Sequence, residues 1–169
     1  MNQADLGILY RQVILDHAKK PHHFRTLPAS VGRQVEKFNP SCGDVLQVRM
    51  VVLENQIQDM SFDGAGCAIS LAAASMLTEQ LIGQSLPAAR KKLAAFSELL
   101  TADQSQGQDQ GGLLTGESQS VESEDGQAQD VDLGELSALA GVRQFPTRLK
   151  CATLASHAAT DLIAKIEGE

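Results

Sequence analysis

One stretch decides the fold: Leu46-Gln47-Val48-Arg49-Met50-Val51-Val52. Its apolar side chains Leu46, Val48, Met50 and Val52 occupy every second position, which is typical of a strand with one buried face. Glu54-Asn55-Gln56 then offers a turn, after which residues 57–63 can return as a partner strand. Residues 31–38 supply a weaker third strand. The sequence therefore predicts a small three-stranded antiparallel sheet.

Helical patterns precede and follow these strands in the sequence. Residues 6–17 carry apolar side chains at spacings of three and four before Pro21, which predicts a first helix. The Gly-rich loop that ends at Cys67 leads into a helix over 68–81, and another is expected over about 85–100. A short helix is expected over 133–141 and a last one from roughly Cys151 to Ile166. The fold class that follows is α+β, with helices packed on the sheet.

Residues 102–131 differ in composition from the rest of the chain. They contain seven of its 21 acidic residues, no Lys or Arg, and many Gln, Gly and Ser. Such a stretch buries too little apolar surface to offset its chain entropy. We therefore expect a disordered Gln-rich acidic insert within a single domain that spans residues 1–169.

Charge and hydropathy exclude several classes of protein. Outside the insert, 14 basic residues face 14 acidic ones, so the expected folded part is nearly neutral and gives no electrostatic case for binding nucleic acid. No apolar run approaches the roughly 20 residues that span a bilayer. Met1 to Asp5 show no signal-peptide pattern. We expect a cytoplasmic protein with no membrane partner.

Three cysteines sit at the edges of the expected elements. An odd number of cysteines in a cytoplasmic protein indicates metal ligands or reactive thiols rather than a disulfide framework. Cys67 and Cys151 each begin an expected helix, where the helix dipole favours a thiolate. Zinc takes four tetrahedral ligands, and Asp44, two residues after Cys42, is the natural fourth. Spacing alone leaves open that these are three unrelated buried thiols.

The histidines are expected to have other roles. His17 lies on a face of the first helix, and His22 and His23 are neighbours in the loop after it. Adjacent histidines rarely point at one ion, so we expect a surface or capping role for His22 and His23, and a structural role for His17. His157 follows Cys151 by six residues, about 240° around a helix, which predicts a packing or surface residue.

Four longer motifs change the weight of these alternatives. Through these motifs and their order along the chain, the sequence resembles the SufU family, the zinc-containing relatives of the IscU and NifU scaffold proteins. The resemblance covers most of residues 6–100 and 141–165, and its strongest parts are Leu9-Tyr10-Arg11-Gln12-Val13-Ile14-Leu15-Asp16-His17, Asn39-Pro40-Ser41-Cys42-Gly43-Asp44, Phe62-Asp63-Gly64-Ala65-Gly66-Cys67-Ala68-Ile69-Ser70 and Phe145-Pro146-Thr147-Arg148-Leu149-Lys150-Cys151-Ala152-Thr153-Leu154-Ala155.

The resemblance implies a function in iron–sulfur cluster assembly. Zn²⁺ ligands of the family match Cys42, Asp44, Cys67 and Cys151, and Cys42 also matches the acceptor of persulfide sulfur. Arg148 matches a basic residue that supports sulfur acceptance. The implied donor is a SufS-type cysteine desulfurase, and a SufBCD-type assembly complex is the implied downstream acceptor.

Two other functions stay open. The same ligands could hold a transient [2Fe–2S] cluster, as in an IscU-type scaffold. IscU-like proteins carry a His just before the last Cys, where this chain has Lys150, and an insertion between the second and third Cys is a SufU feature. Both points favour the sulfur acceptor. They leave open whether it is an enzyme or a sulfur carrier that acts with the desulfurase. The third reading is a binding module with a purely structural zinc.

Overall fold

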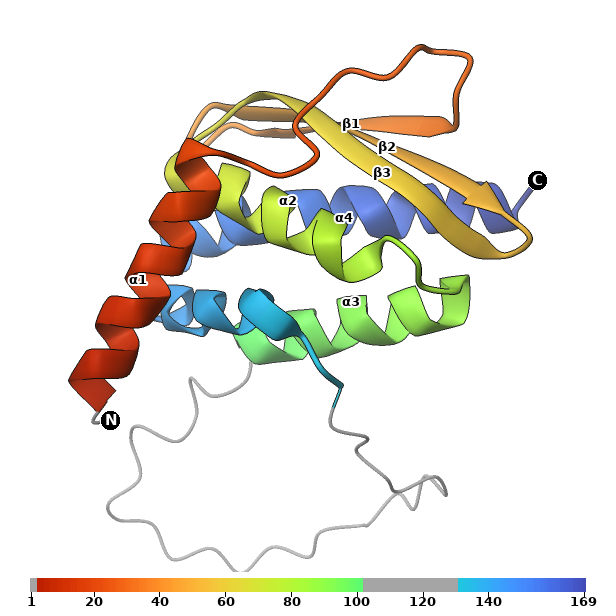
Figure 1. The fold of residues 1–169 in the computed structure, drawn as a ribbon. Helices are drawn as coiled ribbons and strands as arrows, with labels where there is room; N and C mark the ends of the chain where they lie inside the picture. Colours follow the sequence, from red (N-terminus) through yellow and green to blue (C-terminus); the bar gives the residue numbers. More distant parts are fainter. Residues whose placement is uncertain (1–2, 102–130) are drawn as a thin grey trace, which may run out of the picture.

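The computed structural model in Figure 1 describes residues 3–101 and 131–169. Within them the chain forms four α-helices, three strands and one 3-10 helix. In chain order these are α1 (Gln3–Lys19), β1 (Arg33–Asn39), β2 (Asp44–Leu53), β3 (Gln56–Ala65), α2 (Ala68–Leu81), α3 (Leu86–Thr101), the 3-10 helix η1 (Gly134–Gln144) and α4 (Pro146–Glu167).

The predicted antiparallel sheet is confirmed, with β2 at its centre in the order β1-β2-β3. Leu46, Val48 and Met50 are at most 1% exposed, as the alternation predicts. The β2–β3 turn places Glu54 and Asn55 at φ values of 50° and 65°, a left-handed pair that matches the twist of a tight hairpin. A register shift between Val51 and Val52 ends the strict alternation.

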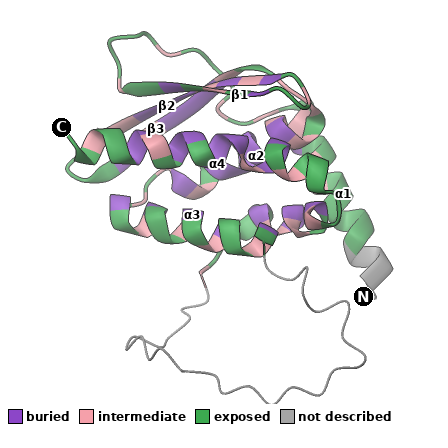
Figure 2. Cartoon of the chain, turned by 180° about the vertical axis from the view of Figure 1, so that it is seen from behind, coloured by how far each residue is buried: buried purple, intermediate pink, exposed green. Residues whose placement is uncertain are grey.

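Three layers build the molecule. The sheet lies on α2 and α4, and α3 with η1 forms a further layer below these helices (Figure 1). Figure 2 shows that buried positions concentrate on β2, β3, α2 and the inner side of α4. Helix α2 is buried on most sides, and its Ala72, Ala73 and Ala74 let the sheet and the neighbouring helix approach closely.

Helix α1 is attached mainly through its second half. Val13, Ile14 and Ala18 pack against the core, whereas Ile8 is 66% and Leu9 48% exposed. The N-terminal end of α1 extends away from the layers in Figure 1. The anchoring of this helix therefore depends on the contacts of its C-terminal half with α2 and η1.

The last helix starts earlier than predicted. Helix α4 begins at Pro146, because proline suits the first turn of a helix, where its missing N–H is not needed. Cys151 is thus the sixth residue of α4 and is fully buried, so the prediction that it occupies the first turn is wrong. Its thiol does not lie at the helix terminus, and the dipole argument applies to Cys67 alone.

The other expected helices are found with modest changes. Helix α2 has the predicted bounds, and α3 begins after Ser85, whose Oγ accepts a hydrogen bond from Ala88 N at 3.3 Å. The short helix is tighter than expected, a 3-10 helix over Gly134–Gln144. The insert predicted at 102–131 lies outside the described residues, apart from Val131, which packs against the core. No helix in the described ranges is long and apolar enough to cross a membrane.

Gly64 offers a test of how tightly β3 is fitted to β2. Its φ is +127°, and an added Cβ would lie 2.1 Å from Val45 O. We expect Gly64→Ala to lower the free energy of unfolding by about 2–4 kcal/mol, from backbone strain and a clash that neither strand can relieve. Urea unfolding measures this.

The matched control is Gly7→Ala, where an added Cβ meets nothing within 4 Å among the described residues. Alanine in place of this helical glycine should raise stability by about 0.5–1 kcal/mol. A Gly64→Ala chain as stable as the wild type would contradict the described fit of β3 against β2.

Candidate metal centre

Three segments distant in sequence meet at one end of the sheet. Because β2 is central, its first residue pairs with the end of β1 (Asn39 opposite Asp44), and Val45 pairs with Ala65 at the end of β3. The β1–β2 turn and the β3–α2 junction are therefore neighbours. Helix α4 contacts both β1 and β2 and brings its own first turns to the same place.

Cys42 lies in the four-residue turn between β1 and β2. Gly43 N donates to Asn39 O at 2.8 Å, and Ser41 N donates to Asn39 Oδ1 at 3.2 Å, so Asn39 organises the turn from its first position. Gly43 adopts φ +72°, which a residue with a Cβ rarely does. The turn holds the Cys42 thiol half-buried, facing α4.

Asp44 is a fully buried carboxylate with a set of donors around it. Its Oδ1 accepts from Cys67 N at 2.8 Å and from Ser70 Oγ at 3.2 Å, and its Oδ2 accepts from Asn39 Nδ2 at 3.0 Å. Burial opposes the charged form, but the Cys67 N–H and the Cys151, Asn39 and Ser70 side chains together keep the pKa of Asp44 below its ordinary value. The buried group is held as an anion.

Cys151 faces this anion from α4. Its thiol donates to Cys42 Sγ at 3.0 Å, and Asn39 Nδ2 lies 3.4 Å from its sulfur. Burial, followed by hydrogen bonding to Cys42, Asp44 and Cys67, raises the pKa of the Cys151 thiol well above its usual range. Three anionic groups cannot share this space at neutral pH without a counter-charge.

The potential ligand atoms of Cys42, Asp44 and Cys151 all lie within 4.8 Å of one another. Cys67 Sγ is outside that group, although Cys67 donates its backbone N–H to Asp44 at 2.8 Å. The geometry thus brings together three of the four predicted ligands and places the fourth at the N-cap of α2 beside them. Two thiols, a carboxylate and a third thiol alongside are a donor set that suits Zn²⁺ or an iron–sulfur cluster.

Arg148 places a positive charge at the open side of this cluster. Its Nη1 lies 3.8 Å from Cys42 Sγ, and the side chain is exposed to solvent. Hydrogen bonding to Cys151, followed by electrostatic interactions with Cys42, Cys67 and Cys151, raises the pKa of Arg148 above its ordinary value. This position agrees with the expectation that Arg148 lies near the site. Its contact is with Cys42, the more accessible of the two clustered thiols.

Sequence reasoning missed the residues that support the ligands. Asn39 bonds Asp44 and Cys151 at once, and Ser70 bonds Asp44 from the first turn of α2. Gly66 lets Ser70 and Asp44 lie close to the backbone of this loop, because a Cβ at Gly66 would lie 2.2 Å from Ser70 Oγ and 3.2 Å from Asp44 Oδ1. The only signal in the sequence was that these residues flank the predicted ligands in the two motifs.

Comparisons with known proteins bear on the family of this chain. The family model of the NifU-like N-terminal domain matches residues 9–110. The zinc-dependent sulfurtransferase SufU of Bacillus subtilis (strain 168) is 36% identical over 98% of this chain and 96% of its own length. The iron–sulfur cluster assembly scaffold protein IscU of Streptococcus pyogenes serotype M1 is also 36% identical, over 98% of this chain and 89% of its own.

Solved structures share the fold. One described as a hypothetical protein has a TM-score of 0.71 at 38% identity and covers 94% of this chain and 98% of its own. FiSufU from Fervidobacterium islandicum AW-1 has a TM-score of 0.69 at 22% identity, over 92% of this chain and 97% of its own. At that identity the second likeness shows the fold alone.

Replacing the buried carboxylate tests its part in the site. Asp44→Asn turns an amide NH₂ towards donors, which should lower the free energy of unfolding by about 1–3 kcal/mol at neutral pH. In the metal-free wild type, the low pKa of Asp44 gives stability that is complete above the ordinary Asp pKa of about 3.9 and lost as the pH falls through the lower folded value. Urea unfolding between pH 7 and pH 2.5 should show this acid loss, reduced in Asp44→Asn.

The control is Asp63→Asn on β3, where the carboxylate accepts from Thr26 Oγ1 at 3.0 Å in an exposed setting. Its effect should stay within about 0.5 kcal/mol. Equal stability and equal acid sensitivity of Asp44→Asn and wild type would contradict a buried, hydrogen-bonded Asp44 anion.

Proposed function

This chain belongs to the SufU family of NifU-like N-terminal domains, and on that premise we propose that it serves iron–sulfur cluster assembly as a zinc-dependent acceptor of persulfide sulfur. The single observation that carries the proposal is the cluster of Cys42, Asp44 and Cys151 within 4.8 Å, with Cys67 beside it. The name of the Bacillus subtilis relative supports both the metal and the chemistry.

Cys42, Asp44, Cys67 and Cys151 are the residues that would hold the zinc. A bound Zn²⁺ supplies the positive charge that keeps thiols deprotonated at neutral pH. The chain itself supplies the rest of the site: Asn39 and Ser70 fix the Asp44 carboxylate, and burial of Cys151 excludes water from one side. Cys42 is left as the accessible sulfur, half-buried on a turn.

The proposed reaction is a thiol–disulfide type of exchange. The Cys42 thiolate attacks the terminal sulfur of a cysteine persulfide on a SufS-type desulfurase. A new sulfur–sulfur bond forms at Cys42, the sulfur–sulfur bond of the donor breaks, and the donor cysteine leaves as a thiolate. The guanidinium of Arg148, 3.8 Å from Cys42 Sγ, stabilises the anionic sulfur that Cys42 then carries. A SufBCD-type complex is the proposed receiver.

A scaffold that assembles a [2Fe–2S] cluster is the second candidate. The identity to the Streptococcus pyogenes protein named IscU equals that to SufU, and the same thiols and carboxylate could hold a cluster. Lys150, exposed one residue before Cys151, favours the zinc protein, since an IscU-like His would offer a further ligand there.

The metal content of the purified chain separates these two functions. Protein produced without added iron should contain about one zinc per chain and show no visible absorption, because three thiolates and a carboxylate satisfy zinc's preferred coordination of about four ligands. Elemental analysis and an absorption spectrum measure this. A brown chain with two irons and two sulfides would favour the scaffold instead.

Variants of Cys42 and Arg148 test the sulfur transfer. With a SufS-type desulfurase and cysteine, Cys42→Ser should abolish both the stimulation of desulfuration and the persulfide on this chain, because the attacking sulfur is gone. Arg148→Gln should slow transfer roughly two- to fivefold, as expected for loss of one solvent-screened charge contact. Alkylation with mass spectrometry locates the persulfide.

Two controls separate chemistry from structure. Lys165→Gln removes an exposed charge at the far end of α4 and should leave transfer unchanged. The melting temperature of Cys42→Ser should show that it is folded. A folded Cys42→Ser chain that stimulates the desulfurase normally would make the zinc purely structural, in keeping with a binding module.

A further inference from the structure

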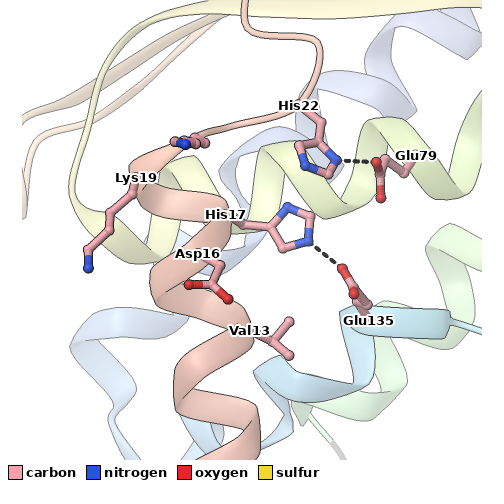
Figure 3. Close-up of a pocket in the computed structure, with 8 residues that line it drawn as sticks. Val13, Asp16, His17, Lys19, His22, Glu79 and Glu135 are labelled. Atoms are coloured by element: carbon pink, nitrogen blue, oxygen red, sulfur yellow. Dashed lines mark hydrogen bonds and ion pairs between the residues drawn. The ribbon is translucent and has the colours of Figure 1, made fainter.

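A second group of potential metal ligands lies at the opposite end of α2. Its members are His17 from α1, His22 from the loop after α1, Glu79 from α2 and Glu135 from η1 (Figure 3). They line a cavity of about 450 Å³. Potential ligand atoms of His17, Glu79 and Glu135 lie within 4.8 Å of one another; His22 stands outside that group and contacts it through Glu79. Cys67 and Glu79 are twelve helical residues apart, about 18 Å along α2, so this is a separate site.

His17 is oriented as metal-binding histidines are. The ring is only 5% exposed, and its Nδ1 lies 2.7 Å from Ser75 Oγ, which also accepts a hydrogen bond from His22 N at 2.7 Å. With one ring nitrogen held, the other, Nε2, points at the Glu135 carboxylate. A fixed outer nitrogen of this kind sets the ring orientation and leaves one nitrogen for a ligand bond.

His22 and Glu79 complete the group from the solvent side. His22 Nδ1 contacts a Glu79 carboxylate oxygen, and the rings of His17 and His22 lie 4.7 Å apart. The side chains of Glu79 and Glu135 are 37% and 55% exposed, so an ion can enter and the two carboxylates can adjust to it. His23, the neighbour of His22, turns away to Thr78 Oγ1 at 3.0 Å.

The charge and the donor types select the ion. Two neutral imidazoles and two carboxylates carry a net charge of −2, which a divalent cation cancels. Asp16, Lys19 and Lys20 also line the cavity, and Lys19 points away from the four side chains in Figure 3. Imidazole nitrogens favour zinc and its first-row neighbours over Mg²⁺ and Ca²⁺, which take oxygen ligands.

We propose that His17, His22, Glu79 and Glu135 form a second Zn²⁺ site that clamps α1 to α2 and η1. Helix α1 gains most from such a clamp, because only its second half packs on the core and His17 stands in its last turn. The site does not depend on the sulfur-transfer function. In the metal-free chain, His17–Glu135 and His22–Glu79 pairs hold the same side chains together.

Zinc titration of the full chain, already loaded with one zinc, tests the proposal. Calorimetry should show one further Zn²⁺ per chain with a Kd of roughly 1–50 μM, in the range of a solvent-open four-ligand site. Glu79→Gln, Glu135→Gln and His22→Gln should each weaken this second binding by about tenfold or more, since each removes a direct ligand. These side chains are all exposed, so the variants should fold.

The absorption spectrum of bound Co²⁺ and the melting temperature with added Zn²⁺ distinguish a metal site from ion pairs alone. Co²⁺, which binds more weakly than zinc and leaves the loaded cysteine site occupied, should show ligand-field bands without a thiolate-to-cobalt charge-transfer band. Free Zn²⁺ at about ten times Kd should raise the melting temperature of wild type by about 3–6 °C, and that of Glu79→Gln/Glu135→Gln by less than half as much.

The matched controls are Glu98→Gln on α3 and His157→Gln on α4, both exposed and outside the cavity, which should bind like wild type. The proposal is overturned if zinc-loaded wild type takes up no second ion below about 1 mM free Zn²⁺, well above the expected Kd. It is equally overturned if the ligand variants bind as tightly as wild type, which would mean adventitious zinc, or if cobalt shows thiolate ligation. None of these three results would change the outcome of the Cys42 experiments.

Discussion

The buried Asp44 carboxylate is the constraint on which the rest of the site depends. It starts β2, accepts the Cys67 N–H at the N-cap of α2, and shares the Asn39 amide with Cys151 of α4. One anion therefore fixes the relative positions of three segments. A carboxylate at 0% exposure beside two thiols is stable only with hydrogen-bond donors or a cation around it. This end of the sheet supplies the donors, and the nearby thiols would need a cation to become thiolates.

The sequence predicted the parts of the fold that are locally encoded. Alternation in residues 46–50 and the left-handed turn at Glu54 and Asn55 give β2 and β3, and Gly83 closes α2. The start of α4 was misplaced because the residues from Pro146 to Lys150 also fit an extended lead-in to a helix. Pro146 starts the helix earlier, because a proline suits the first turn, where its missing N–H is not needed.

Contacts between segments were harder to predict. Nothing local specifies that Cys42 and Cys151, 109 positions apart, lie 3.0 Å from each other; the family motifs suggested it and the packing of α4 produces it. The same holds for His17 and Glu135, 118 positions apart. The sequence places His17 on a face of the first helix with a structural role, but it cannot name the carboxylate that the second ring nitrogen meets.

The four proposed ligands are carried by parts of the chain with unequal rigidity. Asp44, Cys67 and Cys151 are attached to a central strand and two buried helices, whose amides should exchange with solvent only on extensive opening. Cys42 sits on a short turn whose other members, Pro40, Ser41 and Gly43, are exposed. In the proposed function, a small hinge movement of that turn would present the Cys42 sulfur to the donor protein while the other three proposed ligands remain in place.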